Sequence, residues 1–176
     1  MLAIVSGVVA GLVAGLAMLA WQMTIGGLAS EPTAEPGIGT SVFTMPRSVP
    51  AFFFGIDIFG DEYARSALTG AAVHLVVAAG FGAVGMGLLA VLLGPRPASG
   101  PALLLGALYG VVLQLVVLEL FVGGIQEVET VASSTPAWSW WVAHFLYGLV
   151  LALVGAAMLR RIGPAAPAAM DGRASG

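Results

Sequence analysis

Four long apolar runs constrain this chain more than any other feature of its sequence. They cover residues 2–23, 67–94, 101–122 and 137–159. Each has about 20 residues or more, the length of helix that crosses a hydrocarbon layer of roughly 30 Å. A segment inside lipid must satisfy its backbone hydrogen bonds internally, so the runs predict four transmembrane helices. We therefore expect an all-α integral membrane protein.

Composition supports lipid as the surrounding solvent. The chain is 59% hydrophobic and only 9% charged, whereas soluble domains carry roughly 25% charged residues. So few charges cannot cover a surface that faces water. We predict a lipid bilayer as partner and one transmembrane domain over residues 1–163. The small-residue, proline-containing tail over 164–176 is predicted to be disordered.

The first apolar run is predicted to be a helix that is retained, not a cleaved signal peptide. It lacks a basic start, and it exceeds the roughly 7–15 apolar residues of a signal sequence.

The arginines predict the orientation, because the chain contains no lysine. Arg96 lies in the second loop, and three more arginines follow the fourth run, whereas the first loop holds two and the third loop none. The three are Arg160, Arg161 and Arg173, and the two are Arg47 and Arg65. By the positive-inside rule, the second loop and both termini are cytoplasmic in a cell (inner or plasma) membrane. Trp21, Trp138, Trp140 and Trp141 then fall at the outer boundary, where such rings prefer to lie.

The first outer loop, residues 24–66, is long for a connection in a compact bundle. Its second half places Phe52, Ile56, Phe59 and Tyr63 at helical spacing. This pattern is typical of a short helix in the membrane interface, and equally of an apolar plug over the bundle mouth.

An internal repeat relates the two halves of the chain. His74 and His144 are each followed by small residues at the fourth, eighth and eleventh positions, which lie on one helix face. These are Ala78, Gly82 and Gly85 after the first, and Gly148, Ala152 and Gly155 after the second. In the other two helices Gly7 and Gly11 match Gly106 and Gly110, and Gly15 extends the first stripe. The pattern predicts two tandem helical hairpins related by an axis along the membrane normal. Small-residue stripes are also typical of close helix packing, and they specify no chemistry.

Several motifs resemble a family of uncharacterised four-helix membrane proteins of bacteria and archaea, a domain of unknown function. They are "GVVAGLVAGLAM" from Gly7, "MPR" from Met45, "GAAVH" ending at His74, "GALYG" from Gly106 and "HFLYG" from His144. The resemblance covers most of the chain. It implies a four-helix fold in the inner membrane and supplies no substrate, cofactor or reaction.

Polar side chains inside the apolar runs are the candidate functional residues, because such groups are costly in lipid. His74 and His144 each lie about seven residues, or roughly 10 Å, below the outer helix ends. Glu119 and Gln22 are expected at a similar level on the other two helices. Glu119 lies about 140° around its helix from Gln114 on the glycine stripe, so its carboxylate need not face the histidines.

Three interpretations of these residues stay open. The leading one is a non-enzymatic structural or accessory subunit, acting as a homo-oligomer or with a membrane-protein partner, in which the histidines make hydrogen bonds across helices. The second is proton-linked or small-solute transport along His74, His144 and Glu119. The third is a haem b or metal site with the two histidines as ligands and with the small residues making room for the cofactor.

Other functions have no support in the sequence. The chain has no cysteine, a net charge of -3 and no basic cluster, which argues against thiol chemistry and a nucleic-acid partner. Gly80, Gly82 and Gly85 match a dinucleotide-binding spacing, but inside a transmembrane helix they cannot form the required strand-to-helix turn. We expect no catalytic residues.

Overall fold

The computed structural model describes residues 1–29, 63–94, 96–116 and 136–162, and within them the secondary structure is helical. The helices are α1 (Leu2–Ala29), α3 (Tyr63–Leu93), α4 (Ser99–Val116) and α6 (Ala137–Ile162). All four are long and apolar enough to cross a membrane. The prediction of an all-helical protein with four helices long and apolar enough to span a membrane is therefore confirmed for the described residues.

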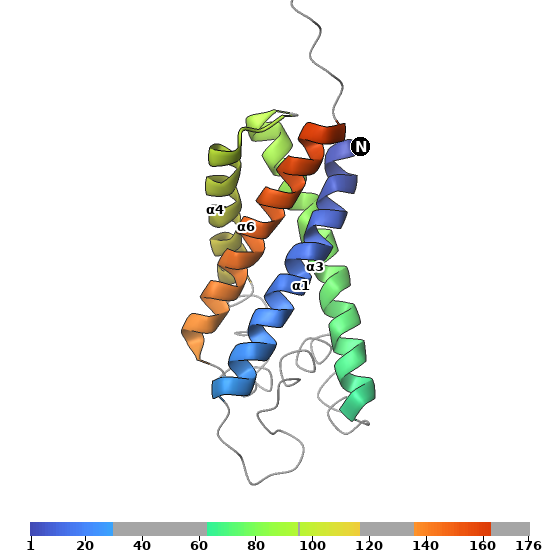
Figure 1. The fold of residues 1–176 in the computed structure, drawn as a ribbon, viewed down its shortest axis with the longest axis vertical. Helices are drawn as coiled ribbons and strands as arrows, with labels where there is room; N and C mark the ends of the chain where they lie inside the picture. The colour runs from blue at the N-terminus through green and yellow to red at the C-terminus, as the bar shows by residue number, and fades with distance from the viewer. Residues whose placement is uncertain (30–62, 95, 117–135, 163–176) are drawn as a thin grey trace, which may run out of the picture.

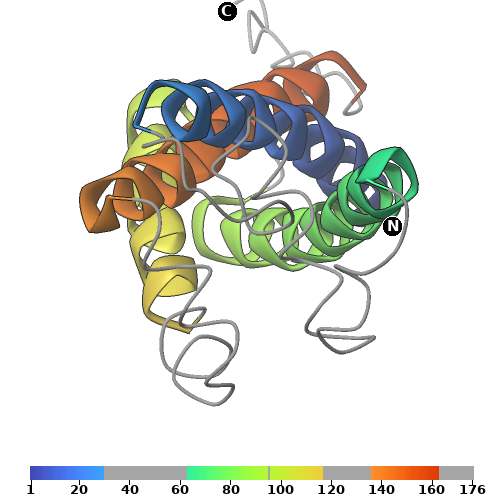
Figure 2. The ribbon, with the colours of Figure 1, turned by 90° about the horizontal axis from the view of Figure 1, so that it is seen from below.

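The helices form an antiparallel bundle in which α1 and α6 are central. α1 packs along both α3 and α6, and α4 packs on α6 (Figures 1 and 2). α3 and α4 are consecutive, yet they touch sparsely. The start of α1, the end of α6 and the connection from α3 to α4 lie at one end of the bundle (Figure 1).

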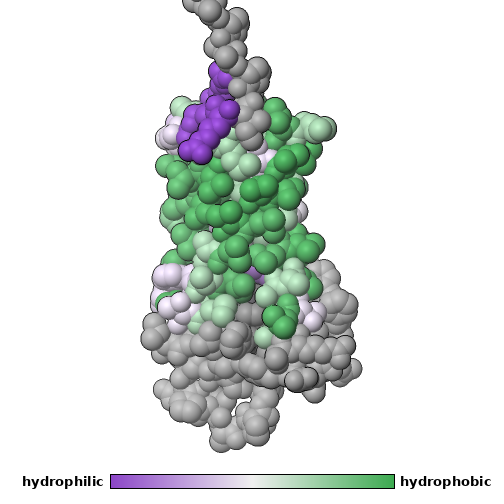
Figure 3. Space-filling view, turned by 45° about the vertical axis from the view of Figure 1, so that its right-hand side comes forward, coloured by the Kyte–Doolittle hydropathy of each residue, from purple (hydrophilic) through white to green (hydrophobic). Residues whose placement is uncertain are grey.

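The outer surface of the helices is apolar. Large aliphatic side chains such as Val76, Val91 and Leu104 are mostly exposed. Figure 3 shows the resulting apolar band, with hydrophilic side chains gathered at the end where α6 finishes. Arg160 and Arg161 are exposed at this end. So large an apolar surface is unfavourable in water and suits a lipid environment.

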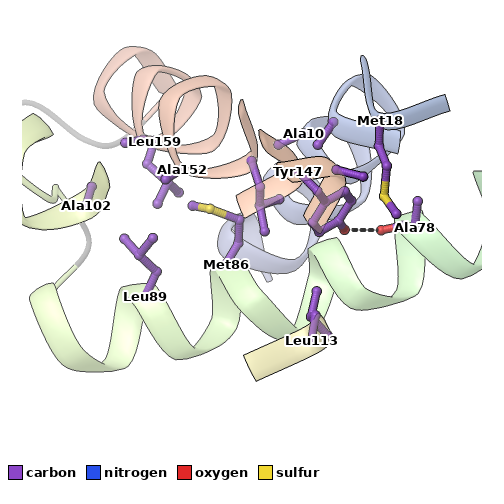
Figure 4. Close-up of a cluster of buried hydrophobic side chains, with 14 residues drawn as sticks. Ala10, Met18, Ala78, Met86, Leu89, Ala102, Leu113, Tyr147, Ala152 and Leu159 are labelled. Atoms are coloured by element: carbon purple, nitrogen blue, oxygen red, sulfur yellow. Dashed lines mark hydrogen bonds between the residues drawn. The ribbon is translucent and has the colours of Figure 1, made fainter. Parts of the chain in front are cut away.

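The interior is filled by a few large side chains among many small ones (Figure 4). Met86 and Leu151 are among the largest fully buried side chains. Alanines from all four helices complete the cluster: Ala10, Ala14, Ala78, Ala102, Ala143, Ala152 and Ala156. Small residues let helix backbones approach closely, which is the main source of packing energy in a membrane.

The helices extend beyond several predicted ends. α1 continues past Met23 to Ala29, and the hydroxyl of Thr24 donates to the carbonyl of Ala20, one turn earlier, at 2.8 Å without ending the helix. α6 runs three residues past Leu159, and Arg160 and Arg161 lie in its last turn, where positive charge favours a helix end. α3 ends at Leu93, followed by Gly94 with φ of 81°, a left-handed conformation that terminates helices.

The predicted first loop, residues 24–66, is therefore too long at both ends. Residues 24–29 belong to α1 and residues 63–66 to α3. The predicted interfacial segment lies outside the described residues, as do residues 117–122 of the third apolar run and the tail over 164–176. α4 starts at Ser99, two residues before the predicted start.

Candidate functional site

His74 joins α3 to α1. Its side chain is 8% exposed, and its Nε2 lies 3.1 Å from the carbonyl oxygen of Gly15. Because a carbonyl only accepts hydrogen bonds, Nε2 is the donor. An added Cβ on Gly15 would lie 2.6 Å from the Cβ of Ala78. Glycine at this position thus lets α1 come close enough for the bond.

His144 bonds differently. It is 5% exposed, and its Nδ1 donates to the carbonyl of Trp140, one turn earlier in the same helix, at 3.0 Å. The expectation that each histidine bonds across helices therefore describes His74 but is wrong for His144. The Nε2 of His144 has no hydrogen-bond partner among the described residues.

A tyrosine fixes the relative depth of the two histidines. The hydroxyl of Tyr147 on α6 donates to the carbonyl of Ala78 on α3 at 2.5 Å (Figure 4). His144 lies three residues before Tyr147, and His74 lies four residues before Ala78. Since α3 and α6 run in the same direction, both histidines lie on the same side of this bond, about 4–6 Å further toward the end of the bundle at which these two helices begin (Figure 1).

The other predicted polar residues do not join the histidines in the described structure. Gln22 is buried on α1. It follows Gly15, the partner of His74, by seven residues, and is therefore about 10 Å further along the helix. Glu119 lies outside the described residues. Within the described helices, no group of three or more His, Cys, Asp or Glu side chains gathers where it could hold a metal ion.

Two tyrosines were not predicted as site residues. Tyr109 on α4 donates its hydroxyl to the carbonyl of Phe81 on α3 at 2.7 Å, and Tyr147 on α6 makes the bond to Ala78. Both tyrosines therefore tie a later helix to α3. The signal was present in the sequence, because each is preceded by leucine and followed by a stripe glycine, in "LYG".

Gln114 was also missed. Its side chain is 0% exposed, and neither Oε1 nor Nε2 has a hydrogen-bond partner in the described structure. Buried amides nearly always have partners. The sequence signal is its spacing: Gln114 follows Gly106 and Gly110 at intervals of four residues.

The glycine stripe of α1 lies against α3. An added Cβ on Gly7 would lie 2.5 Å from the carbonyl oxygen of Gly82, and one on Gly11 would lie 2.5 Å from that of Ala78. Real Cβ atoms essentially never come so near a backbone atom. The backbones of α1 and α3 are thus in direct contact along this stripe.

The glycine stripe of α4 makes the same kind of contact with α6. An added Cβ on Gly106 would meet the carbonyl of Gly148 and the Cβ of Ala152, and one on Gly110 would lie 2.9 Å from the carbonyl carbon of His144. In both helix pairs the stripe therefore replaces side-chain packing by backbone contact.

Gly85 and Gly155 have a different role from the other predicted packing glycines. An added Cβ on Gly85 would lie 2.7 Å from the ring of Tyr109, and one on Gly155 would meet the side chain of Met86. These two glycines make room for large side chains of neighbouring helices, not for a helix backbone.

The space proposed for a haem is occupied by the protein. Gly11 and Gly106 bring helix backbones against the small residues that follow each histidine. The ring of Tyr147, which is 2% exposed, bridges α6 and α3 one turn inward of both histidines. His74 already donates from Nε2 to Gly15. The geometry therefore does not fit a macrocycle held between His74 and His144.

Comparison of the chain with models of protein families, with curated proteins and with solved structures finds no match. The resemblance to a four-helix family therefore stays a prediction. The four long apolar helices and their apolar surface fit the class of multi-pass membrane proteins.

Proposed function

We propose that this chain is a non-enzymatic structural or accessory subunit of the inner (plasma) membrane. Its partner is a second membrane protein or further copies of the chain. The proposal includes the predicted membership of a four-helix family of unknown function.

One observation supports it most: the polar groups within the bundle mainly bond helices to one another. His74 donates to α1, and Tyr109 and Tyr147 donate to α3. Each bond ends on a backbone carbonyl, so these groups lock helix positions. The glycine stripes bring helices into backbone contact at the same levels. This arrangement favours a rigid bundle over a chemical centre.

We place both termini in the cytoplasm. Arg96, Arg160 and Arg161 are exposed, and Arg160 Nη1 donates to the carbonyl of Pro97 at 3.2 Å, in the connection between α3 and α4. At the other end, Trp21 donates to the carbonyl of Ser139 at 3.2 Å and its ring centroid lies 6.2 Å from that of Trp138. Arginines at one end and tryptophans at the other support this orientation.

We also propose that the fold consists of two tandem hairpins, α1 with α3 and α4 with α6. Support comes from equivalent contacts. Gly11 meets Ala78 and Gly82, as Gly106 meets the corresponding Gly148 and Ala152. These contacts favour matching Gly11 and Gly15 to Gly106 and Gly110, one turn from the register expected from the sequence. The symmetry is approximate, because α1 packs on α6 whereas α3 and α4 touch sparsely.

A second candidate is proton-linked or small-solute passage. Gln114 and His144 favour it, because both are buried and both have polar atoms without partners among the described residues. Such groups mark solute routes through membrane proteins. The described helices leave this candidate second, because the other intramembrane histidine is bonded to Gly15.

Purification in mild detergent and reconstitution in liposomes separate the two candidates. A subunit is expected to copurify with one identified membrane protein in fixed stoichiometry, or as a defined homo-oligomer, and to give no flux alone. Proton or solute flux by the protein alone that is lost in His144→Phe would overturn the subunit proposal and establish passage.

A further inference from the structure

Gln114 is the starting point, because its amide is buried without a partner. The side chain is 0% exposed, and both Oε1 and Nε2 lack a hydrogen bond in the described structure. In the membrane interior the free-energy cost of an unsatisfied polar group is higher than in a water-soluble protein, since no solvent competes for it. Something that hydrogen-bonds to the amide is therefore expected.

The α4–α6 contact locates Gln114 relative to His144. Gly110 lies against the backbone of His144, and Gln114 is one turn further along the same face of α4. Because α4 and α6 are antiparallel, the opposing turn of α6 is the one before His144, which contains Trp140. Gln114 and Trp140 thus lie at the same level of this helix pair.

The imidazole of His144 lies along that same turn. Its Nδ1 is 3.0 Å from the carbonyl of Trp140, so Nδ1 carries the hydrogen and Nε2 presents a lone pair. No described residue hydrogen-bonds to this Nε2. An acceptor nitrogen and an unpaired amide therefore belong to adjoining turns of two helices in backbone contact.

We propose that Gln114 and His144 form a binding site for a small neutral molecule that both donates and accepts hydrogen bonds, with water as its smallest member. The ligand donates to Nε2 of His144 and exchanges hydrogen bonds with the amide of Gln114. A neutral ligand is specified because α1, α3, α4 and α6 contain no Asp or Glu within their described bounds to balance a cation.

The α1–α3 pair provides an internal control for this assignment. When Gly11 and Gly15 are matched to Gly106 and Gly110, the position of Gln114 corresponds to Leu19, which is buried and apolar. In that pair Nε2 of His74 is bonded to Gly15. At the equivalent position, the first pair has an apolar side chain and a histidine that is already bonded. Only the second pair has a hydrogen-bond donor and an acceptor that are available to a ligand. The site does not depend on the proposed accessory role.

Nuclear magnetic resonance of the full-length protein in deuterated detergent tests the proposal with water as the probe. The chain has three glutamines, Gln22, Gln114 and Gln126, so Gln22→Leu and Gln126→Leu assign the Gln114 amide by elimination. We expect a cross peak between the Gln114 amide protons and a bound water, and a His144 ring with the hydrogen on Nδ1. In His144→Phe, which keeps a ring of similar shape, the cross peak is lost. Absence of the cross peak in the unaltered protein, or its persistence in His144→Phe, overturns the proposal.

A thermal-denaturation cycle gives a second, independent readout. If one ligand bridges the two side chains, Gln114→Leu and His144→Phe each lower the midpoint, and the double variant is no worse than the more damaging single one. Leucine at this position reproduces the apolar residue of the matched α1 position. A Gln114→Leu variant that is more stable than the unaltered protein shows that the amide had no partner, and rules out the site.

Discussion

The two helix pairs share a backbone contact but differ in their polar groups. In α1–α3 the histidine bonds across the interface to Gly15, and the residue beyond the glycines is Leu19. In α4–α6 the histidine bonds to its own helix at Trp140, and the corresponding residue is Gln114. Equivalent glycine contacts therefore do not determine how the neighbouring polar side chains are hydrogen-bonded. In the first pair the histidine is bonded across the interface, whereas the second pair has unpaired polar atoms on Gln114 and His144.

The largest effect is expected from filling the glycine contacts, which are common to both pairs. Gly11→Leu and Gly148→Leu would each force a side chain into an opposing backbone. We expect each to lower the free energy of unfolding by roughly 3 kcal/mol or more, because neither backbone can yield without separating the helices. Differential scanning fluorimetry in detergent measures the loss.

Gly80→Leu and Gly87→Leu are matched controls, because an added Cβ at either position meets no atom within 4 Å. They are expected to leave stability unchanged or to raise it, since glycine is roughly 0.8–1.0 kcal/mol less favourable than alanine in a helix and leucine ranks just below alanine. Equal losses at the contact and control glycines would show that the stripes are not the packing surfaces.

The tyrosine bonds to α3 should give the next largest effect. Tyr147→Phe and Tyr109→Phe each remove one donor to a carbonyl of α3. Interhelical hydrogen bonds in membranes contribute about 0.6 kcal/mol on average and up to about 1.7 kcal/mol. We expect Tyr147→Phe to cost more, because Tyr147 is fully buried whereas Tyr109 is half-buried. A ranking reversed in chemical denaturation would contradict the assignment of Tyr147 as the main connection between α6 and α3.

The histidines themselves test the difference between the pairs directly. His74→Ala and His144→Ala make the same truncation at two buried positions. We expect His74→Ala to lower the unfolding free energy by about 0.6 kcal/mol more, since His74 bonds directly to another helix whereas His144 is joined to α4 only through the proposed ligand. Equilibrium unfolding in mixed micelles gives both values. A larger loss at His144 would place the stronger interhelical interaction in the second pair.

The sequence predicted the helices well because lipid imposes a simple rule on length and polarity. It predicted their ends less well, since Thr24 can either stop a helix or bond back to Ala20, and only the structure distinguishes these. At Gly7, Gly11, Gly106 and Gly110 of the stripes, an added Cβ would meet the backbone of another helix.

The contact register and the bonding of the polar groups could not be derived in the same way. The helices are apolar on nearly all sides, so no polar face indicates how each is rotated in the bundle. The α1 glycines recur every four residues, so either Gly7 with Gly11 or Gly11 with Gly15 can be matched to Gly106 and Gly110. The sequence pattern is the same in both cases. The partner of His144 depends on a side-chain rotamer, and the isolation of Gln114 depends on two packed helices. Residue spacing predicts neither the partner of His144 nor the unpaired state of Gln114.

The smallest effect is expected where the two pairs are joined at the arginine-bearing end. Arg160 on α6 donates to the carbonyl of Pro97 in the connection from α3 to α4. Arg160→Ala removes this bond at an exposed position, so the unfolding free energy should change by less than about 0.5 kcal/mol. Hydrogen exchange at the amides of Arg96 and Ala98, the residues that flank Pro97, should nevertheless accelerate, because the connection loses its bond to α6. Arg161→Ala, one residue further along the same helix, is the control and should leave that exchange unchanged. Equal acceleration in both variants would mean that local charge, not the bond to Pro97, protects the connection between α3 of the first pair and α4 of the second.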